Sequence, residues 1–354
     1  MGSVFVKGVK KGTPDFQLKR IIQEEFIDAT DDMSWLKPGE FVLLKPALNS
    51  PDPYPATCHP LALSAVAEVL KDRGAKVFVG DQSGIEHVVQ GPQGVVKGSS
   101  KDLYQGSGMA DCGLAFRGFE EDGWGRGFFH FPKAPSWNDG FYMTNMIQRV
   151  HHIINLPRLS THIQSGVTLG FKNLTGMLRE DSRMEFHADG PFNYFVKACA
   201  GKARMKHVFN DEHKFFEKMV EISLAVKDKL RCTLFSGTKA QVTFGPDARM
   251  MNFKSYVVEP DNGLIIASQD QVSAEAVALA FLTHLYKNIP KTERFKQRLL
   301  IKMNRQIKEL GTERVWDNKF IAHAMKLGLS DNRIDIVDEN VPPELRKELD
   351  TLLS

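Results

Sequence analysis

The chain is organised around one segment, which reads Val150-His-His-Ile-Ile-Asn-Leu-Pro-Arg-Leu-Ser-Thr-His-Ile-Gln-Ser-Gly-Val-Thr-Leu-Gly-Phe-Lys-Asn-Leu-Thr-Gly-Met-Leu-Arg179. It opens with a short, mostly apolar run, residues 153–156, which predicts a buried β-strand. Pro157 ends this strand, because proline cannot donate to a β-ladder and disfavours a helical conformation at the residue before it. The polar, glycine-containing residues that follow predict a loop at the end of the strand.

The predicted loop concentrates polar chemistry in a few positions. We expect His162 and Lys172 to be catalytic, with His162 as the proton carrier and Lys172 as a charge partner. Ser165, Asn173 and Arg179 are expected to bind the substrate beside them. Loops at strand ends often carry function, because the sheet holds them rigidly while their sequences vary. The alternative is structural: a histidine that satisfies a local hydrogen bond, and a lysine on the surface.

Two further strands end in polar residues. Residues 41–44 form a continuous apolar run, which is typical of a strand buried on both faces of a parallel sheet. Residues 76–80 form a second strand, with a helix between the two. Lys45 and Asn49 follow the first strand, and we expect both to bind substrate unless their loop is only a rigid turn. Asp81 follows the second strand as a substrate-binding residue, an acid or a metal ligand, or else as a cap of the next element.

Strands alternating with helices predict an α/β fold with a mostly parallel sheet flanked by helices. We expect residues 1–340 to form one large α/β domain, with two lobes as an option, and residues 341–354 to form a C-terminal helix. Residues 84–150 are rich in glycine and aromatic residues and predict an insertion of turns and short hairpins. Hydrophobic spacing predicts strands over residues 4–9, 232–235 and 264–267, and helices over residues 15–29, 60–74, 212–229, 272–286, 292–310, 315–327 and 342–353.

Composition narrows the class of protein. The small net charge of +3, with lysines and arginines interleaved among acids, gives no sign of a nucleic-acid partner. No apolar run reaches membrane-spanning length and no export signal is evident, so we expect a cytoplasmic protein without a membrane partner. No cysteine pair has Cys-x-x-Cys spacing, so no iron–sulfur cluster is expected. The cysteines are Cys58, Cys112, Cys199 and Cys232.

Four segments carry a resemblance to a known family. They read Leu44-Lys-Pro-Ala-Leu-Asn-Ser-Pro-Asp-Pro53, Gly80-Asp-Gln-Ser-Gly84, Asn155-Leu-Pro-Arg-Leu-Ser-Thr-His162 with Gly166-Val-Thr-Leu-Gly-Phe-Lys-Asn-Leu-Thr-Gly176, and Ala267-Ser-Gln-Asp270. Together they resemble the motifs of a large prokaryotic family known as domain of unknown function 362, over residues 40–330. That family has no single assigned reaction, so the resemblance implies membership rather than chemistry.

The sequence departs from that family at three positions. Ser160 stands where the family commonly has a lysine, so the substrate is expected to differ if that lysine normally binds an anion. Gln271 replaces a proline of the late motif, and Glu275 replaces its second aspartate. The acidic character of the late motif is therefore kept, while its rigid turn is lost.

The order of a histidine, a glycine turn, a lysine and a second histidine is also similar to the N-terminal domain of nickel-dependent lactate racemases. This resemblance implies that His162 acts as acid and base on the substrate. It further implies that Lys172 carries a nickel-pincer nucleotide and that His187 ligates the metal. Fold-level likeness does not fix chemistry, so the cofactor is left open between a metal, a metal-nucleotide group and none.

The sequence thus predicts an enzyme that acts on a small anionic, carboxylate-like molecule by histidine-assisted proton or hydride transfer. Its class would be isomerase, in the manner of a racemase, or oxidoreductase. The alternative is a non-catalytic protein that binds a small molecule or a metal with the same loops. The sequence does not indicate the oligomeric state.

Overall fold

A computed structural model of the chain describes residues 2–187, 214–250, 253–298, 301, 307, 309–330 and 332–354. In this part of the chain, no helix is both long enough and apolar enough to cross a membrane.

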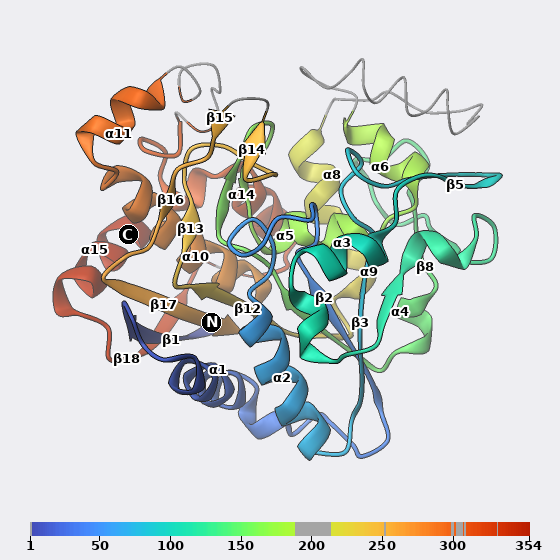
Figure 1. Ribbon diagram of the computed structural model, residues 1–354, viewed down its shortest axis with the longest axis horizontal. Coiled ribbons are helices and arrows are strands. Elements are labelled where there is room, and N and C mark those ends of the chain that lie inside the picture. Colours follow the sequence, from blue (N-terminus) through green and yellow to red (C-terminus); the bar gives the residue numbers. More distant parts are fainter. Residues whose placement is uncertain are drawn as a thin grey trace.

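One eight-stranded sheet forms the centre of the molecule, in the order β18-β1-β17-β12-β9-β2-β3-β6 (Figure 1). Neighbouring strands are parallel, except that β17 runs antiparallel to both β1 and β12. The predicted α/β fold with a mostly parallel sheet is therefore confirmed. The strands are β1 (Gly2–Lys10), β2 (Phe41–Pro46), β3 (Lys76–Asp81), β6 (Phe116–Gly118), β9 (His152–Leu156), β12 (Leu230–Gly237), β17 (Asn262–Ser268) and β18 (Ile334–Glu339).

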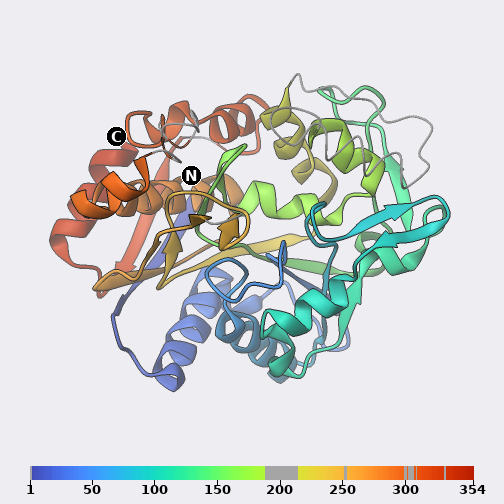
Figure 2. The ribbon, with the colours of Figure 1, turned by 45° about the horizontal axis from the view of Figure 1, so that its top comes forward.

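Helices cover both faces of this sheet, because its central strands are apolar on both sides. Val42 and Leu44 face one core, which α1 (Asp15–Ala29) and α2 (Pro60–Asp72) complete. Leu43 faces the other core, together with helices from the later part of the chain. In Figure 2 the blue helices α1 and α2 lie on one side of the sheet, and the green to red helices lie on the other. The helices of the second side include α5 (Gly170–Asn173), α8 (Phe215–Glu221) and α10 (Gln271–Lys287).

Smaller elements surround this framework. A four-stranded sheet has the order β11-β10-β13-β16, and three hairpins pair β4 with β5, β7 with β8, and β14 with β15. The remaining strands are β4 (Val89–Gly91), β5 (Gly94–Lys97), β7 (Phe128–Phe131), β8 (Phe141–Thr144), β10 (Ser160–His162), β11 (Gly166–Thr168), β13 (Ala240–Gln241), β14 (Arg249–Met250), β15 (Phe253–Lys254) and β16 (Val257–Val258). The remaining helices are α3 (Ser100–Gly106), α4 (Met146–Arg149), α6 (Glu180–His187), α9 (Ser223–Val226), α11 (Lys291–Lys296), α14 (Lys319–Lys326) and α15 (Pro343–Leu353), with 3-10 turns at η1 (Asp31–Met33), η2 (Met109–Cys112), η3 (Phe119–Asp122), η4 (Leu174–Met177) and η6 (Val315–Asp317).

Two expectations differ from the structure, and a third is tested only in part. The segment after β9 is not wholly a loop, because β10 and β11 pair as an antiparallel hairpin that places His162 opposite Gly166. The helix predicted over residues 212–229 is divided into α8 and α9 in its described part. Part of the helix predicted over residues 292–310 lies outside the described residues.

Candidate functional site

A cavity open to solvent lies beyond the carboxyl ends of β2, β3 and β9. The β10–β11 hairpin, α5 and the loop at Pro246 complete its wall. Ligands of parallel sheets bind at this edge, because the strand-end loops meet there. The residues singled out from the sequence that line it are Lys45, Asn49, Asp81, His162, Lys172 and Asn173.

Two other residues singled out from the sequence, Ser165 and Arg179, do not line this cavity in the structure. Ser165 sits in the turn of the β10–β11 hairpin, where its hydroxyl donates to the backbone oxygen of Val167 at 2.7 Å, and it lines a separate, smaller pocket. Arg179 is engaged elsewhere: it makes a bidentate ion pair with Asp181 at 2.6 and 2.9 Å. The backbone of His187 ends α6, while its side chain lies outside the described residues.

Arg179 illustrates how a basic residue of the quoted segment can be structural. Its guanidinium lies 4.4 Å from the ring centre of Trp124 and 3.5 Å from that of Tyr142. The planar guanidinium suits this stacking, and the bidentate pair with the aspartate satisfies its donors. Arg179 therefore holds α6 against the aromatic part of the chain instead of facing the cavity.

A buried ion pair forms the floor of the cavity. Lys45 Nζ lies 2.9 Å from Asp81 Oδ1, and both side chains are almost fully buried. The backbone nitrogen of Leu48 donates to Asp81 Oδ2 at 3.1 Å, and Lys45 also donates to the backbone oxygen of Pro46 at 2.8 Å. Burial raises the pKa of Asp81 to about 6 and lowers the pKa of Lys45, although each group stabilises the charge of the other.

Buried amides connect this floor to α5. Asn173 Nδ2 donates to the backbone oxygen of Lys45 at 3.0 Å and to Asn155 Oδ1 at 2.7 Å. Asn155 Nδ2 in turn donates to the backbone oxygen of Gly170 at 3.1 Å. The ends of β2 and β9 are thereby tied to the short helix that carries Lys172, which fixes the position of that helix.

Glu275 holds α5 from the opposite side. Its Oε2 accepts hydrogen bonds from the backbone nitrogens of Gly170 at 2.6 Å and Phe171 at 3.2 Å. Burial raises the pKa of this carboxyl to about 8, while the two N–H donors oppose that shift. Glu275, at the altered late motif, is thus a capping residue of the helix that carries Lys172.

Lys172 is the ionisable side chain with the most unusual surroundings in the cavity. Its side chain is half-buried, and no described residue makes a hydrogen bond or ion pair with its amine. Burial is the main cause that lowers its pKa to about 7, and the nearby guanidinium groups of Arg158 and Arg183 lower it further. A lysine of this kind is neutral in a large fraction of molecules near neutral pH and can accept a proton.

Two arginines that the sequence analysis did not single out surround this amine. Arg158 is buried, and its Nη1 donates to the backbone oxygen of Pro246 at 2.6 Å and to that of Ala56. Its Nε and Nη2 are buried and make no hydrogen bond to the residues that the structure describes. Arg183 is also buried, and its Nη2 donates to the backbone oxygen of Ser83 at 2.5 Å. An anion in the cavity would supply acceptors for Arg158 that the protein itself does not supply.

His162 is held in one tautomer by its own hairpin. Its Nδ1 accepts hydrogen bonds from the backbone nitrogens of Gln164 at 3.1 Å and Ser165 at 3.3 Å. A nitrogen that accepts in this way carries no proton. The neutral His162 ring that lines the cavity therefore carries its proton on Nε2.

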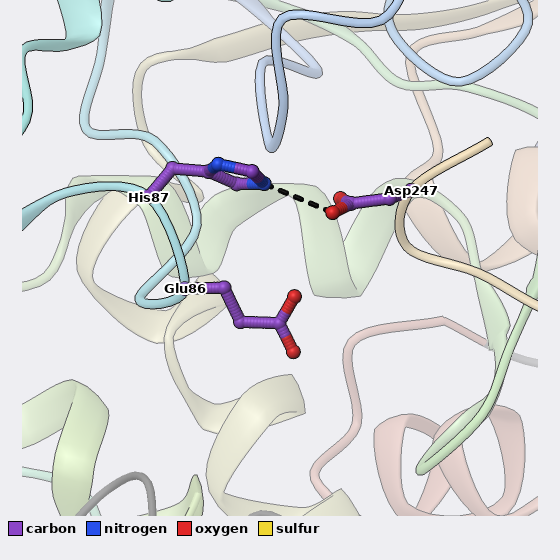
Figure 3. A group of neighbouring side chains, drawn as sticks. All are labelled: Glu86, His87 and Asp247. Carbon is purple, nitrogen blue, oxygen red and sulfur yellow. Dashed lines mark hydrogen bonds and ion pairs between the residues drawn. The ribbon is translucent and has the colours of Figure 1, made fainter. Parts of the chain in front are cut away.

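A second polar group at the cavity rim also went unnoticed in the sequence. Glu86, His87 and Asp247 approach one another there, with His87 Nε2 3.0 Å from Asp247 Oδ2 (Figure 3). Arg158 could have been suspected from its place in the quoted segment. The rim group could not, because His87 and Asp247 are separated by 160 positions and neither belongs to a recognisable metal motif.

The cofactor implied by the racemase resemblance can be compared with these residues. The Lys172 amine faces a cavity and has a lowered pKa, which suits a lysine that carries a covalently attached group. The proposed metal ligand, His187, has no described side chain. Among the described residues, Lys172 fits the role of cofactor anchor. The side chain of the expected metal ligand, His187, lies outside them.

The chain has an α/β fold with a cavity at the strand ends, and Lys45, Lys172, Arg158 and Arg183 are among the residues that line it. Residues 42–280 match the family described as Domain of unknown function (DUF362), and the chain belongs to that family. A curated relative is the thylakoid-associated protein sll1697 of Synechocystis sp., which is 26% identical over 222 residues, covering 60% of this chain and 56% of the relative. The match thus spans just over half of the relative's length. No solved structure gives a significant match to the chain.

Proposed function

We propose that this protein is an enzyme that binds a small carboxylate-bearing anion in the cavity and moves a proton to and from it. The observation that carries the proposal is the Lys172 amine, with its lowered pKa, beside the incompletely paired guanidinium of Arg158. Arg158 and Arg183 would bind the carboxylate, and Lys172 would accept the proton. This assigns the enzyme to the isomerase class, in the manner of a racemase.

The binding step prepares the proton transfer. A carboxylate placed between the arginines offsets their positive charge, which would otherwise keep the pKa of Lys172 low. The neutral amine accepts a proton from the substrate, and the bound anion then favours the resulting ammonium. In this proposal His162 donates a hydrogen bond from Nε2 to the oxygen on which negative charge develops, whereas the sequence analysis expected it to carry the proton.

The second candidate function is anion binding without turnover. The observation that favours it is the Lys45–Asp81 ion pair, which is buried and forms a charged floor suited to holding a ligand. The two candidates share the binding step. They differ in whether the substrate exchanges a proton with solvent.

The test is a deuterium-exchange measurement in D2O with small 2-hydroxy and 2-oxo acids, followed by NMR, beside binding of the same acids by calorimetry. We expect exchange in the wild type and in Lys239→Met, a control at a half-exposed lysine outside the cavity lining. Lys172→Arg is expected to bind but not exchange, because a guanidinium keeps the charge and cannot act as a base near neutral pH. Arg158→Gln is expected to lose affinity.

The outcomes separate the candidates. Binding without exchange in both the wild type and Lys172→Arg supports a non-catalytic anion-binding protein. Deuterium exchange of the substrate by Lys172→Arg at the wild-type rate would show that Lys172 is not the base. Unchanged affinity in Arg158→Gln would remove the anion site.

A further inference from the structure

Three side chains at the rim of the cavity offer a ligand set for a cation. Glu86, His87 and Asp247 each contribute one donor atom, and these atoms all lie within 4.8 Å of one another. In Figure 3 the Glu86 carboxylate turns toward the space beside the hydrogen-bonded pair of His87 and Asp247. Two carboxylates and an imidazole therefore converge from two separate segments of the chain.

Both segments hold their side chains in place without a bound ion. The backbone nitrogens of His87 and Val88 donate to the backbone oxygen of Gly84 at 2.8 and 3.0 Å, which forms a tight turn beneath Glu86 and His87. On the other segment, Gln241 Nε2 donates to the backbone oxygen of Asp247 at 2.8 Å. The ligand atoms are thus preorganised, which lowers the entropic cost of binding.

The carboxylates of this group are incompletely satisfied. Asp247 Oδ1 is buried and accepts no hydrogen bond from the described residues. No described residue donates a hydrogen bond to the Glu86 carboxylate or forms an ion pair with it, although its side chain is half-buried. Partly buried carboxylate oxygens of this kind are costly unless a cation or a donor occupies the space between them.

We propose that Glu86, His87 and Asp247 bind a divalent first-row transition-metal ion. Such ions bond to imidazole nitrogen and carboxylate oxygen at about 2.0–2.2 Å, which places neighbouring ligand atoms roughly 3–3.5 Å apart. His87 Nε2 and Asp247 Oδ2 are 3.0 Å apart, which falls in this range, and the ion would take the place of the proton that they share in a hydrogen bond. The Glu86 donor atom lies within 4.8 Å of both. The imidazole favours zinc or iron over magnesium and calcium, which prefer oxygen ligands, and the two carboxylates also suit manganese.

This ligand set leaves coordination positions open. Glu86 and Pro246, the neighbour of Asp247, both line the cavity, so the open positions face the space in which an anion would bind. Three protein ligands with an open position are the usual arrangement of catalytic metal sites, whereas structural sites are closed by four. Lys172 is not one of the metal's ligands, so metal binding can be measured apart from the role proposed for Lys172, although the Glu86 carboxylate also raises the pKa of that lysine.

The experiment is calorimetric titration of the chelator-treated full chain with Zn²⁺ and, separately, with Mn²⁺. We expect one saturable site per chain for at least one of the two ions. Glu86→Gln, His87→Gln and Asp247→Asn should each weaken its affinity by about tenfold or more, since even residues that only orient metal ligands contribute that much. Asp247→Asn keeps the size of the side chain and guards against a trivial loss of folding.

The matched control is His284→Gln. His284 Nδ1 lies 2.7 Å from Glu348 Oε2, so this variant breaks a histidine–carboxylate pair that has no third ligand among the residues that the structure describes. It should bind the metal as the wild type does, and the same ion should raise the melting temperature of both. Absence of a saturable site for either ion, or wild-type affinity in the three ligand variants, would overturn the proposal.

Discussion

Lys172 shows how the surroundings of one side chain create its chemistry. An isolated lysine is a proton donor at neutral pH, whereas burial and two nearby guanidinium groups lower the pKa of this one to about 7. The same surroundings destabilise its charged form in the folded protein. Protonation of Lys172 is therefore coupled to folding as well as to ligand binding.

This coupling predicts a pH-dependent effect of Lys172→Met. The unfolded chain, with the ordinary pKa of 10.5, binds the proton more tightly than the folded protein does. The resulting destabilisation is absent above pH 10.5, grows as the pH falls and is complete below about pH 7. Without ligand, Lys172→Met should be more stable than the wild type at pH 6.5, and the difference should shrink as the pH rises toward 10. Urea unfolding across this range measures it, and a difference that does not change with pH would contradict the lowered pKa.

Secondary-structure elements meet closely where the cavity floor is built. Gly176, in the turn after α5, lies so near the end of β3 that a Cβ placed on it would come within 1.9 Å of Asp81 Oδ1. The backbone oxygen of Gly176 accepts a hydrogen bond from the nitrogen of Gln82 at 2.9 Å. The Asp81 carboxylate cannot move away from this Cβ, because Lys45 contacts its Oδ1 and the backbone nitrogen of Leu48 donates to its Oδ2.

Gly176→Ala should therefore destabilise the protein by about 1–3 kcal/mol or more, as an overpacked interior does. It should also weaken anion binding, because the floor of the cavity must shift. The control is Gly125→Ala, since a Cβ on Gly125 would meet no atom within 4 Å. Urea unfolding of the two variants compares them, and equal stability would show that η4 and β3 are not packed as tightly as described.

Contacts between loops from distant parts of the chain close one wall of the cavity. Tyr54 lies in the loop after β2. Its hydroxyl donates a hydrogen bond to the backbone oxygen of Ser236, at the end of β12, at 2.9 Å, and accepts one from the backbone nitrogen of Lys239 at 2.8 Å. Asn49 Nδ2 donates to the backbone oxygen of Pro246 at 3.2 Å in the same region. Loss of these contacts would loosen one wall of the site.

Tyr54→Phe should cost about 1–3 kcal/mol of stability, because it leaves buried backbone groups without partners. It should also lower the affinity for the anion. Tyr104→Phe is the matched control, since the Tyr104 hydroxyl is buried and makes no hydrogen bond within the described residues, so its removal should be neutral or slightly stabilising. Thermal unfolding distinguishes the two, and equal effects would show that the Tyr54 contacts do not close the wall.

Much of the framework could be predicted from local sequence. The apolar runs at residues 41–44, 76–80 and 153–156 became β2, β3 and β9, because burial on both faces of a parallel sheet leaves a continuous apolar pattern. The edge strand β18 was not predicted. Its sequence alternates charged and apolar residues near the end of the chain, and the sequence analysis did not identify it as a strand. In the structure it pairs in parallel with β1, and this pairing makes it a strand.

The sequence by itself also determined the family and the edge of the sheet at which polar side chains would gather. The tertiary structure decided which of them share the cavity: Lys45, Asp81 and Lys172 do, whereas Arg179 is bound by Asp181 and two aromatic rings. It also decided the tautomer of His162 and brought Asp247 to Glu86 and His87. Hydrophobic periodicity records which backbone is buried. The pKa values, hydrogen-bond partners and ligand sets depend on residues that only the folded chain brings together.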